Sequence, residues 1–292
     1  MSAKRTKGAR VQQGVDFAMQ KTEGENFLSP SLLRSQPPRQ RGPLEIAIIA
    51  LRRLQMKELW QAFLDNAGFV AVCFGIVLAL YLGAKLLERY MPSKRSISPT
   101  RRLTIVSLCG ALAAVLMLWE IPLPFLAPGF YKLDFSELPI LLCGFFVGPA
   151  GAVACEGVKV LLNLLFDGTT TAFVGEFANF TVGCCLVLPA AVFYRLWHTR
   201  KGAIISCLIG TICISALGSA FNAFYLLPKF AQLYGMPLEV IVGMGTAINP
   251  AITNVGTFVM FAVARLNLIK GLSVSLLTVL LYKKIARPLF ER

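Results

Sequence analysis

Long apolar runs recur through most of this chain and restrict it to few classes of fold. Residues 67–87 could cross a bilayer once as a helix, since about 20 apolar residues suffice for one span. Six further apolar segments follow along the chain at residues 103–119, 138–148, 150–166, 173–197, 203–227 and 268–285. With 56% hydrophobic and only 15% charged residues, a water-soluble globule is excluded. The sequence therefore predicts an all-α integral membrane protein, with a six-helix core and one extra N-terminal transmembrane or re-entrant segment.

The basic residues lie in short clusters at the ends of these apolar segments. The net charge of +14 could suggest nucleic acid as a partner, but short basic clusters beside apolar segments are typical of membrane topology. Residues 88–102 form such a cluster and are predicted to be a basic cytoplasmic linker. The basic C-terminal residues 283–292 are placed on the same side. We therefore expect a multi-pass protein of the cell membrane that binds the lipid bilayer and no nucleic acid.

The N-terminal third divides into three parts. Residues 1–43 are polar and basic and are predicted to be a disordered tail. Residues 44–66 mix apolar and basic positions at helical spacing, which predicts an amphipathic helix at the membrane interface or, equally, a coiled-coil contact. If residues 67–87 span the membrane, the basic tail lies outside, against the positive-inside rule. Either that segment is re-entrant or the tail is exported, with Met91 as an alternative translation start being a third possibility.

Several residue types needed for catalysis or metal binding are missing. The chain has one histidine, His198, so neither a histidine-based triad nor a histidine-ligated metal centre can be assembled. All eight cysteines lie in apolar segments without CxxC spacing, which is typical of small buried side chains. No GxxxxGK[ST] phosphate-binding loop occurs. We expect no enzyme activity, no metal and no cofactor; a lipid-modifying enzyme that uses Asp134 and Glu137 as an acid/base pair is a weaker alternative.

The loop at residues 120–137 combines prolines and aromatic residues with a few polar groups. Prolines stiffen a loop and aromatic rings offer flat apolar surface, so we expect a lid over a flat heteroaromatic ligand. Leu133, Asp134 and Phe135 would supply its ligand contacts. Alternatively, Asp134 and Ser136 cap the helix that follows.

Polar residues also occur inside the apolar segments, where isolated charges cost a few kcal/mol. Asn267 and Lys270 are three residues apart at the predicted start of the last helix, so they share one face and can reach one ligand; snorkelling of Lys270 to the surface is the alternative. Glu156 and Lys159 have the same spacing, which favours mutual neutralisation, with Asn163 nearby. Other polar residues begin the fourth core helix and could cap it, bind Lys159 or line the site: Glu176 and Asn179.

Three blocks carry a family resemblance: FYKLDFSELPILLCGFFVGPAG at 130–151, GEFANF at 175–180 and LNLIKG at 266–271. They resemble the substrate-binding (S) component of energy-coupling factor (ECF) vitamin importers, most closely its riboflavin-binding branch, over residues 101–292. The resemblance implies that Asn267 and Lys270 contact the vitamin, as does Asn222. It further implies capture of riboflavin or a close flavin analogue outside the cell and delivery inside with a transmembrane coupling subunit and two ATP-binding subunits. An ion-coupled secondary transporter of a small polar solute is the alternative function.

The first core helix carries small residues at spacings of three and four: Ser107, Gly110, Ala111 and Ala114. Such a face lets another helix approach closely. The resemblance implies that it docks onto the coupling subunit. Ordinary packing within the core is the alternative.

Overall fold

The computed structural model describes residues 57, 59–91 and 97–290. The predicted tail at 1–43, most of the predicted interfacial helix at 44–66 and the middle of the 88–102 linker lie outside these residues. The helices are α3 (Ala67–Tyr90), α4 (Pro99–Met117), α5 (Glu137–Val147), α6 (Pro149–Asp167), α7 (Val174–Leu196), α8 (Arg200–Cys213), α9 (Ser219–Phe221), α10 (Leu227–Tyr234), α11 (Leu238–Thr246), α12 (Val255–Phe258) and α13 (Ala264–Phe290). Three π-helical turns complete them: η2 (Ile214–Gly218), η3 (Asn222–Leu226) and η4 (Val259–Val263).

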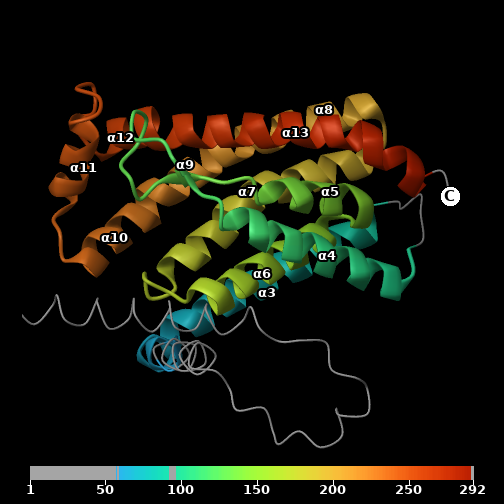
Figure 1. The fold of residues 1–292 in the computed structure, drawn as a ribbon, viewed down its shortest axis with the longest axis horizontal. Coiled ribbons are helices and arrows are strands. Elements are labelled where there is room, and N and C mark those ends of the chain that lie inside the picture. Colours follow the sequence, from blue (N-terminus) through green and yellow to red (C-terminus); the bar gives the residue numbers. More distant parts are fainter. Residues whose placement is uncertain (1–56, 58, 92–96, 291–292) are drawn as a thin grey trace, which may run out of the picture. The chain divides into compact units, whose positions relative to one another are not determined.

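The described residues contain six helices that are long and apolar enough to cross a membrane. They start at Ala67, Pro99, Pro149, Val174, Arg200 and Val255. This confirms the predicted all-α membrane fold. The shorter α5 is buried along nearly its whole length among α4, α6, α7 and α13. Figure 1 shows it enclosed between the longer helices, as expected of a partial helix packed within protein.

The connection between α4 and α5 folds back on itself. Two short strands, β1 (Ile121–Pro122) and β2 (Lys132–Leu133), pair antiparallel with Ile121 opposite Leu133. Beside them Lys132 forms an ion pair with Glu120. The residues between the strands therefore form a closed loop, which Figure 1 places beside α12.

Two predicted helix boundaries are wrong. The fifth core helix was expected to end at residue 227, but it continues to Tyr234. The last was expected to begin at residue 268, but it begins at Val255, because Asn254 and Thr257 form a capping box and an apolar run follows. The connection at 228–264 consequently contains α11 and the beginning of the last helix. Asn267 and Lys270 lie roughly three turns or more inside that helix, not on its first turn.

The helix α3 lies along α6, as Figure 1 shows, and is fixed near both of its ends. At one end Phe69 packs edge-on against Phe177 of α7, with ring centroids 6.2 Å apart. At the other end Glu88 makes three contacts. Its Oε1 accepts a hydrogen bond from Ala150 N at 2.8 Å, its Oε2 lies 2.8 Å from Arg102, and its backbone carbonyl accepts from Arg195 at 3.3 Å. Glu88 thus joins the end of α3 to α4, α6 and α7.

We expect Glu88→Gln to lower the free energy of unfolding in detergent by about 1–2 kcal/mol. The carboxylate is nearly buried and makes a charge-assisted bond to the first turn of α6, while its pairing with the more exposed Arg102 adds less. Chemical unfolding followed by tryptophan fluorescence measures this change. Glu120→Gln is the matched control, since Glu120 pairs with Lys132 in an exposed position and its loss should cost under about 1 kcal/mol. Equal effects of the two variants would contradict the role given to Glu88.

Candidate functional site

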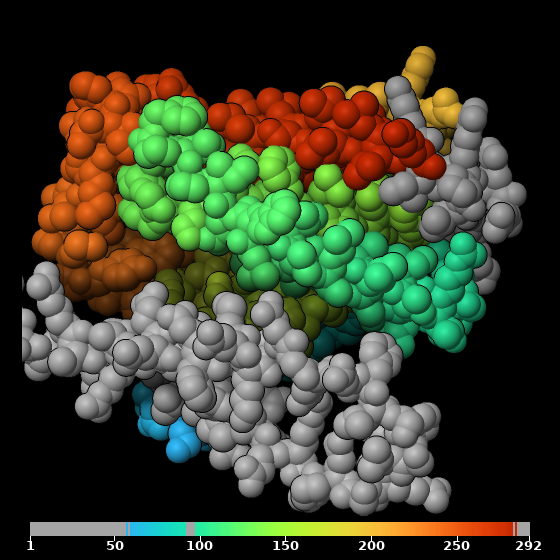
Figure 2. All heavy atoms as spheres, in the orientation of Figure 1, coloured from blue at the N-terminus to red at the C-terminus, as the bar shows by residue number. Residues whose placement is uncertain are grey.

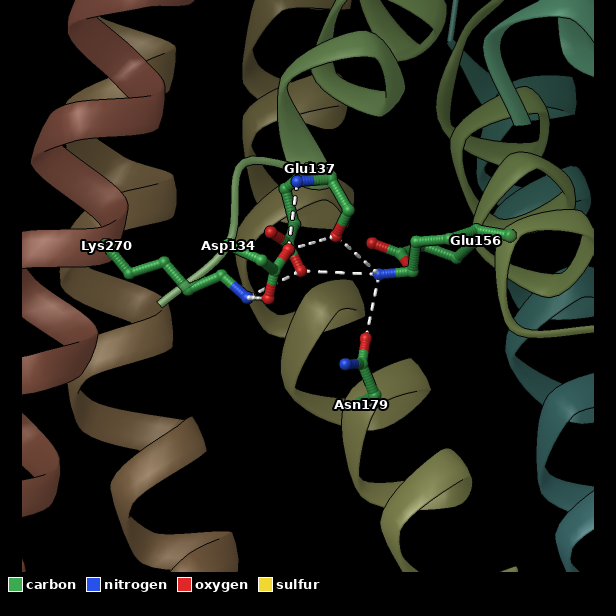
Figure 3. A network of polar contacts seen from close by, with 7 residues as sticks. Asp134, Glu137, Glu156, Asn179 and Lys270 are labelled. Atoms are coloured by element: carbon green, nitrogen blue, oxygen red, sulfur yellow. Dashed lines mark hydrogen bonds and ion pairs between the residues drawn. The ribbon is translucent and has the colours of Figure 1, made fainter. Parts of the chain in front are cut away.

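A buried network of charged side chains lies where the loop meets the helices. Lys270 Nζ is 2.9 Å from Asp134 Oδ2 and 3.0 Å from Glu137 Oε1. Lys159 Nζ is 3.3 Å from the same Glu137 oxygen and 2.7 Å from Glu156 Oε2. Figure 3 shows Lys270 and Glu156 reaching toward Asp134 and Glu137 from opposite sides. One carboxylate oxygen of Glu137 is therefore shared by two ammonium groups that come from different helices.

Neutral groups complete this network. Lys159 donates to Asn179 Oδ1 at 2.8 Å and to Ser136 Oγ at 3.3 Å. Ser136 in turn donates its backbone N–H to Asp134 Oδ1 at 2.9 Å. The predicted neutralisation of Glu156 by Lys159 is confirmed, although Asn179, and not Asn163, supplies the amide. Ser136 stands at the start of α5, but its side chain makes no capping hydrogen bond.

The ion pairs keep Asp134 charged. Burial alone would raise the pKa of its carboxyl, but the ammonium groups of Lys270 and Lys159 hold that pKa below its ordinary value. Asp134 is thus a carboxylate at neutral pH and accepts hydrogen bonds only. It neutralises Lys270 and keeps the loop attached to α13, so Lys270 is a buried, paired cation and does not snorkel to the surface.

Two buried asparagines lie close to the π-helical turns: Asn222 is the first residue of η3, and Asn267 lies on α13. Asn222 Nδ2 donates to the Gly218 carbonyl at 2.8 Å. Asn267 Nδ2 donates to the Ile214 carbonyl at 3.4 Å and to Ser219 Oγ at 3.3 Å. Each asparagine thus bonds a carbonyl of the same π-helical turn, η2, and such turns often occur at functional sites. No donor among the described residues bonds Asn267 Oδ1, which leaves this acceptor available to a ligand.

The loop supplies Tyr131, which sequence reasoning missed. Its hydroxyl donates to Asn222 Oδ1 at 2.9 Å, and its ring lies 6.2 Å from that of Phe258. Burial raises the pKa of Tyr131, so the hydroxyl keeps its proton at neutral pH. The sequence does show a tyrosine beside the predicted lid residues. Spacing alone does not show which aromatic residue of the loop reaches an amide 91 positions away.

The loop also packs against the helices that follow the fifth core helix. Ala127 and Tyr131 pack in an apolar cluster with Ile241 of α11, Phe258 of α12 and Ile252, which lies between these two helices. Figure 2 shows the loop as a green surface against the orange and red atoms of α11 to α13. The loop therefore covers the end of the helices that carries the two asparagines.

The remaining predicted site residues have different surroundings. Leu133 is buried and Phe135 is partly buried against the main core. Glu176 accepts from Thr171 Oγ1 at 3.2 Å, a contact local to the start of α7, whereas Asn179 contacts Lys159. The structure thus joins Asp134, Asn179 and Lys270 in one network, and leaves Glu176 outside it.

A family model described as "ECF transporter, substrate-specific component" matches residues 101–282. The chain belongs to this family. It is therefore a multi-pass membrane transport protein and not an enzyme. The match runs from α4 into α13 and includes every residue of the candidate site, whereas α3 lies outside it.

Relatives of this substrate-specific component include two named riboflavin transporters. RibU of Staphylococcus aureus (strain TCH60) is 35% identical over 193 residues, which are 66% of this chain and 94% of the relative. FmnP of Bacillus subtilis (strain 168) is 29% identical over 193 residues, 66% of this chain and 95% of the relative. A solved structure, reported as "Structure and mechanism of the S component of a bacterial ECF transporter", is 34% identical with a TM-score of 0.53 and covers 66% of this chain and 99% of that one.

The small residues of α4 in this substrate-specific component face two directions. Gly110 and Ala114 are buried, and a Cβ on Gly110 would lie 2.6 Å from Val158 Cγ1 of α6. Ser107 and Ala111 are exposed. Packing within the core therefore accounts for Gly110 and Ala114, and only Ser107 and Ala111 remain open to a partner.

Proposed function

We propose that this chain captures riboflavin for an ATP-driven importer. The observation that carries the proposal is the 35% identity to a riboflavin transporter over 94% of that relative's length. Two buried asparagines and a paired lysine, gathered beneath an aromatic loop, support it. Riboflavin itself or a close flavin analogue is the expected ligand.

The chemistry of riboflavin suits these residues. Its ring system is flat and largely apolar, while its uracil-like edge and ribityl hydroxyls need neutral donors and acceptors. Asn222 and Asn267 offer both kinds of group, and Lys270 offers donors. Leu133 and Phe135 are proposed to form apolar contacts, and Asp134 to hold Lys270 in place. Asn179 supports this network through Lys159, and Glu176 is the weakest of the proposed site residues.

Transport is proposed to need other subunits. The chain has no phosphate-binding loop, so ATP would be bound by two ATP-binding subunits that act through a transmembrane coupling subunit. Ser107 and Ala111, exposed on α4, are proposed to meet the coupling subunit. The basic linker at 88–102 is proposed to be cytoplasmic, which puts the loop at the outer face, where the vitamin enters.

Riboflavin titration of the purified full chain tests the proposal. We expect quenching of flavin fluorescence with a nanomolar dissociation constant, and no competition by a large excess of thiamine, which lacks the flavin ring system. Absence of quenching and of co-purified flavin would overturn the proposal. Uptake by proteoliposomes that contain only this chain, driven by a proton or sodium gradient, would instead support an ion-coupled transporter.

A further inference from the structure

The hydrogen bond between Tyr131 and Asn222 has a fixed direction. A backbone carbonyl can only accept, so the 2.8 Å contact to Gly218 O must come from Asn222 Nδ2. The Oδ1 atom of Asn222 consequently faces Tyr131, and the Tyr131 hydroxyl must be the donor across 2.9 Å. The Asn222 amide is held at both of its ends, by the loop on one side and by its own helix on the other.

The ring of Tyr131 is held by packing that does not involve its hydroxyl. It lies 4.7 Å from the Phe130 ring and 6.2 Å from the Phe258 ring, measured between centroids. It also packs against the apolar cluster of Ile241 and Ile252. Removal of the hydroxyl alone should therefore leave the loop in place, so the contribution of this one hydrogen bond can be measured.

We infer that Tyr131 is a positioning residue that orients the Asn222 amide toward the ligand and so sets the selectivity of the site. This inference rests on the proposed function. The Gly218 carbonyl sets which end of the amide donates, but an amide held at that end alone can still twist about its Cβ–Cγ bond. When both ends of the Asn222 amide are bound, its remaining N–H and its remaining oxygen lone pair point to fixed places, where the ligand meets them. The uracil-like edge of riboflavin, which alternates carbonyl and N–H groups, matches a fixed order of this kind.

Tyr131→Phe in the full chain tests the inference. We expect riboflavin affinity to fall about tenfold, which corresponds to about 1.4 kcal/mol, with little change in the thermal midpoint. Affinity for riboflavin methylated at N3, which cannot donate from that edge, should fall less, so the preference for riboflavin over this analogue shrinks. In a chain that already carries Asn222→Ala, Tyr131→Phe should add no further loss. Tyr234→Phe is the matched control, since Tyr234 is exposed on α10, and it should change neither affinity.

The outcomes separate this inference from the proposed function. If the unaltered chain binds riboflavin but Tyr131→Phe weakens both ligands equally, or adds its full effect to Asn222→Ala, Tyr131 only fastens the loop and the inference is overturned. Unchanged affinity for both ligands in Tyr131→Phe overturns it as well. If the unaltered chain binds no riboflavin, both the proposed function and the inference fail.

Discussion

Lys159→Met is expected to destabilise the protein by about 3–5 kcal/mol, the largest effect of any substitution considered. Lys159 is fully buried and contacts two carboxylates, Glu137 and Glu156, so its removal leaves buried negative charge without a counter-ion. Methionine is unbranched like lysine and fills much of the same space, so the loss of charge dominates the result. The thermal midpoint in detergent and the yield of monodisperse protein measure the effect.

Two further variants isolate the cause. Lys132→Met makes the same chemical change in an exposed ion pair and should cost under about 1 kcal/mol. Adding Glu156→Met to Lys159→Met removes the carboxylate that lies 2.7 Å from the lysine, and should recover a large part of the lost stability. If the double variant is less stable than Lys159→Met alone, uncompensated charge is not the reason for the loss.

Asn267→Leu is expected to reduce riboflavin affinity by about 100-fold. Leucine has nearly the size of asparagine but can neither donate nor accept, so two polar groups of the enclosed ligand would lose their partner at about 1–3 kcal/mol each. The two contacts of Asn267 within the protein, at 3.3 and 3.4 Å, are long and contribute little to stability. Fluorescence titration gives the affinity, and unfolding in detergent gives the stability.

A second buried polar residue of the same helix provides the control for Asn267→Leu. Thr278 is also buried on α13, and within the described part of the chain its hydroxyl bonds only the Val274 carbonyl of the same helix. Thr278→Val should leave riboflavin affinity unchanged. If Asn267→Leu binds riboflavin as tightly as this control, Asn267 does not contact the ligand.

The membrane fold could be predicted because each apolar segment carries its own signal, independent of its neighbours. The pairing of Glu156 with Lys159 could be predicted for the same reason, since residues three apart on a helix share a face. The contact between Lys270 and Asp134 spans 136 positions and depends on how α13 packs beside the loop. The sequence singled out Glu137 with Asp134, as an alternative acid/base pair, and nothing in the pattern indicates that one of its oxygens contacts two lysines.

The start of the last helix was misplaced for a different reason. Polar residues at 266–271 gave the impression of a helix beginning, whereas the real signal was Asn254 followed three residues later by Thr257. Threonine takes the place of the usual glutamate or glutamine in this capping box, so the motif is easily missed. Because the helix begins at Val255, Asn267 and Lys270 lie in the protein interior and not at a helix end. This changes what their side chains can contact.

The position of α3 decides which surface the surrounding lipid touches. Ala84 of α3 packs in one apolar cluster with Val153 of α6 and with Phe180 and Cys184 of α7, and these residues are buried. Phe74, Leu82 and Leu86 on the other faces of α3 are exposed. We expect acyl chains on this side to solvate α3 in place of the helices behind it. A subunit that approached from this direction would meet α3 first, so α3 restricts the directions from which partner helices can reach α6 and α7.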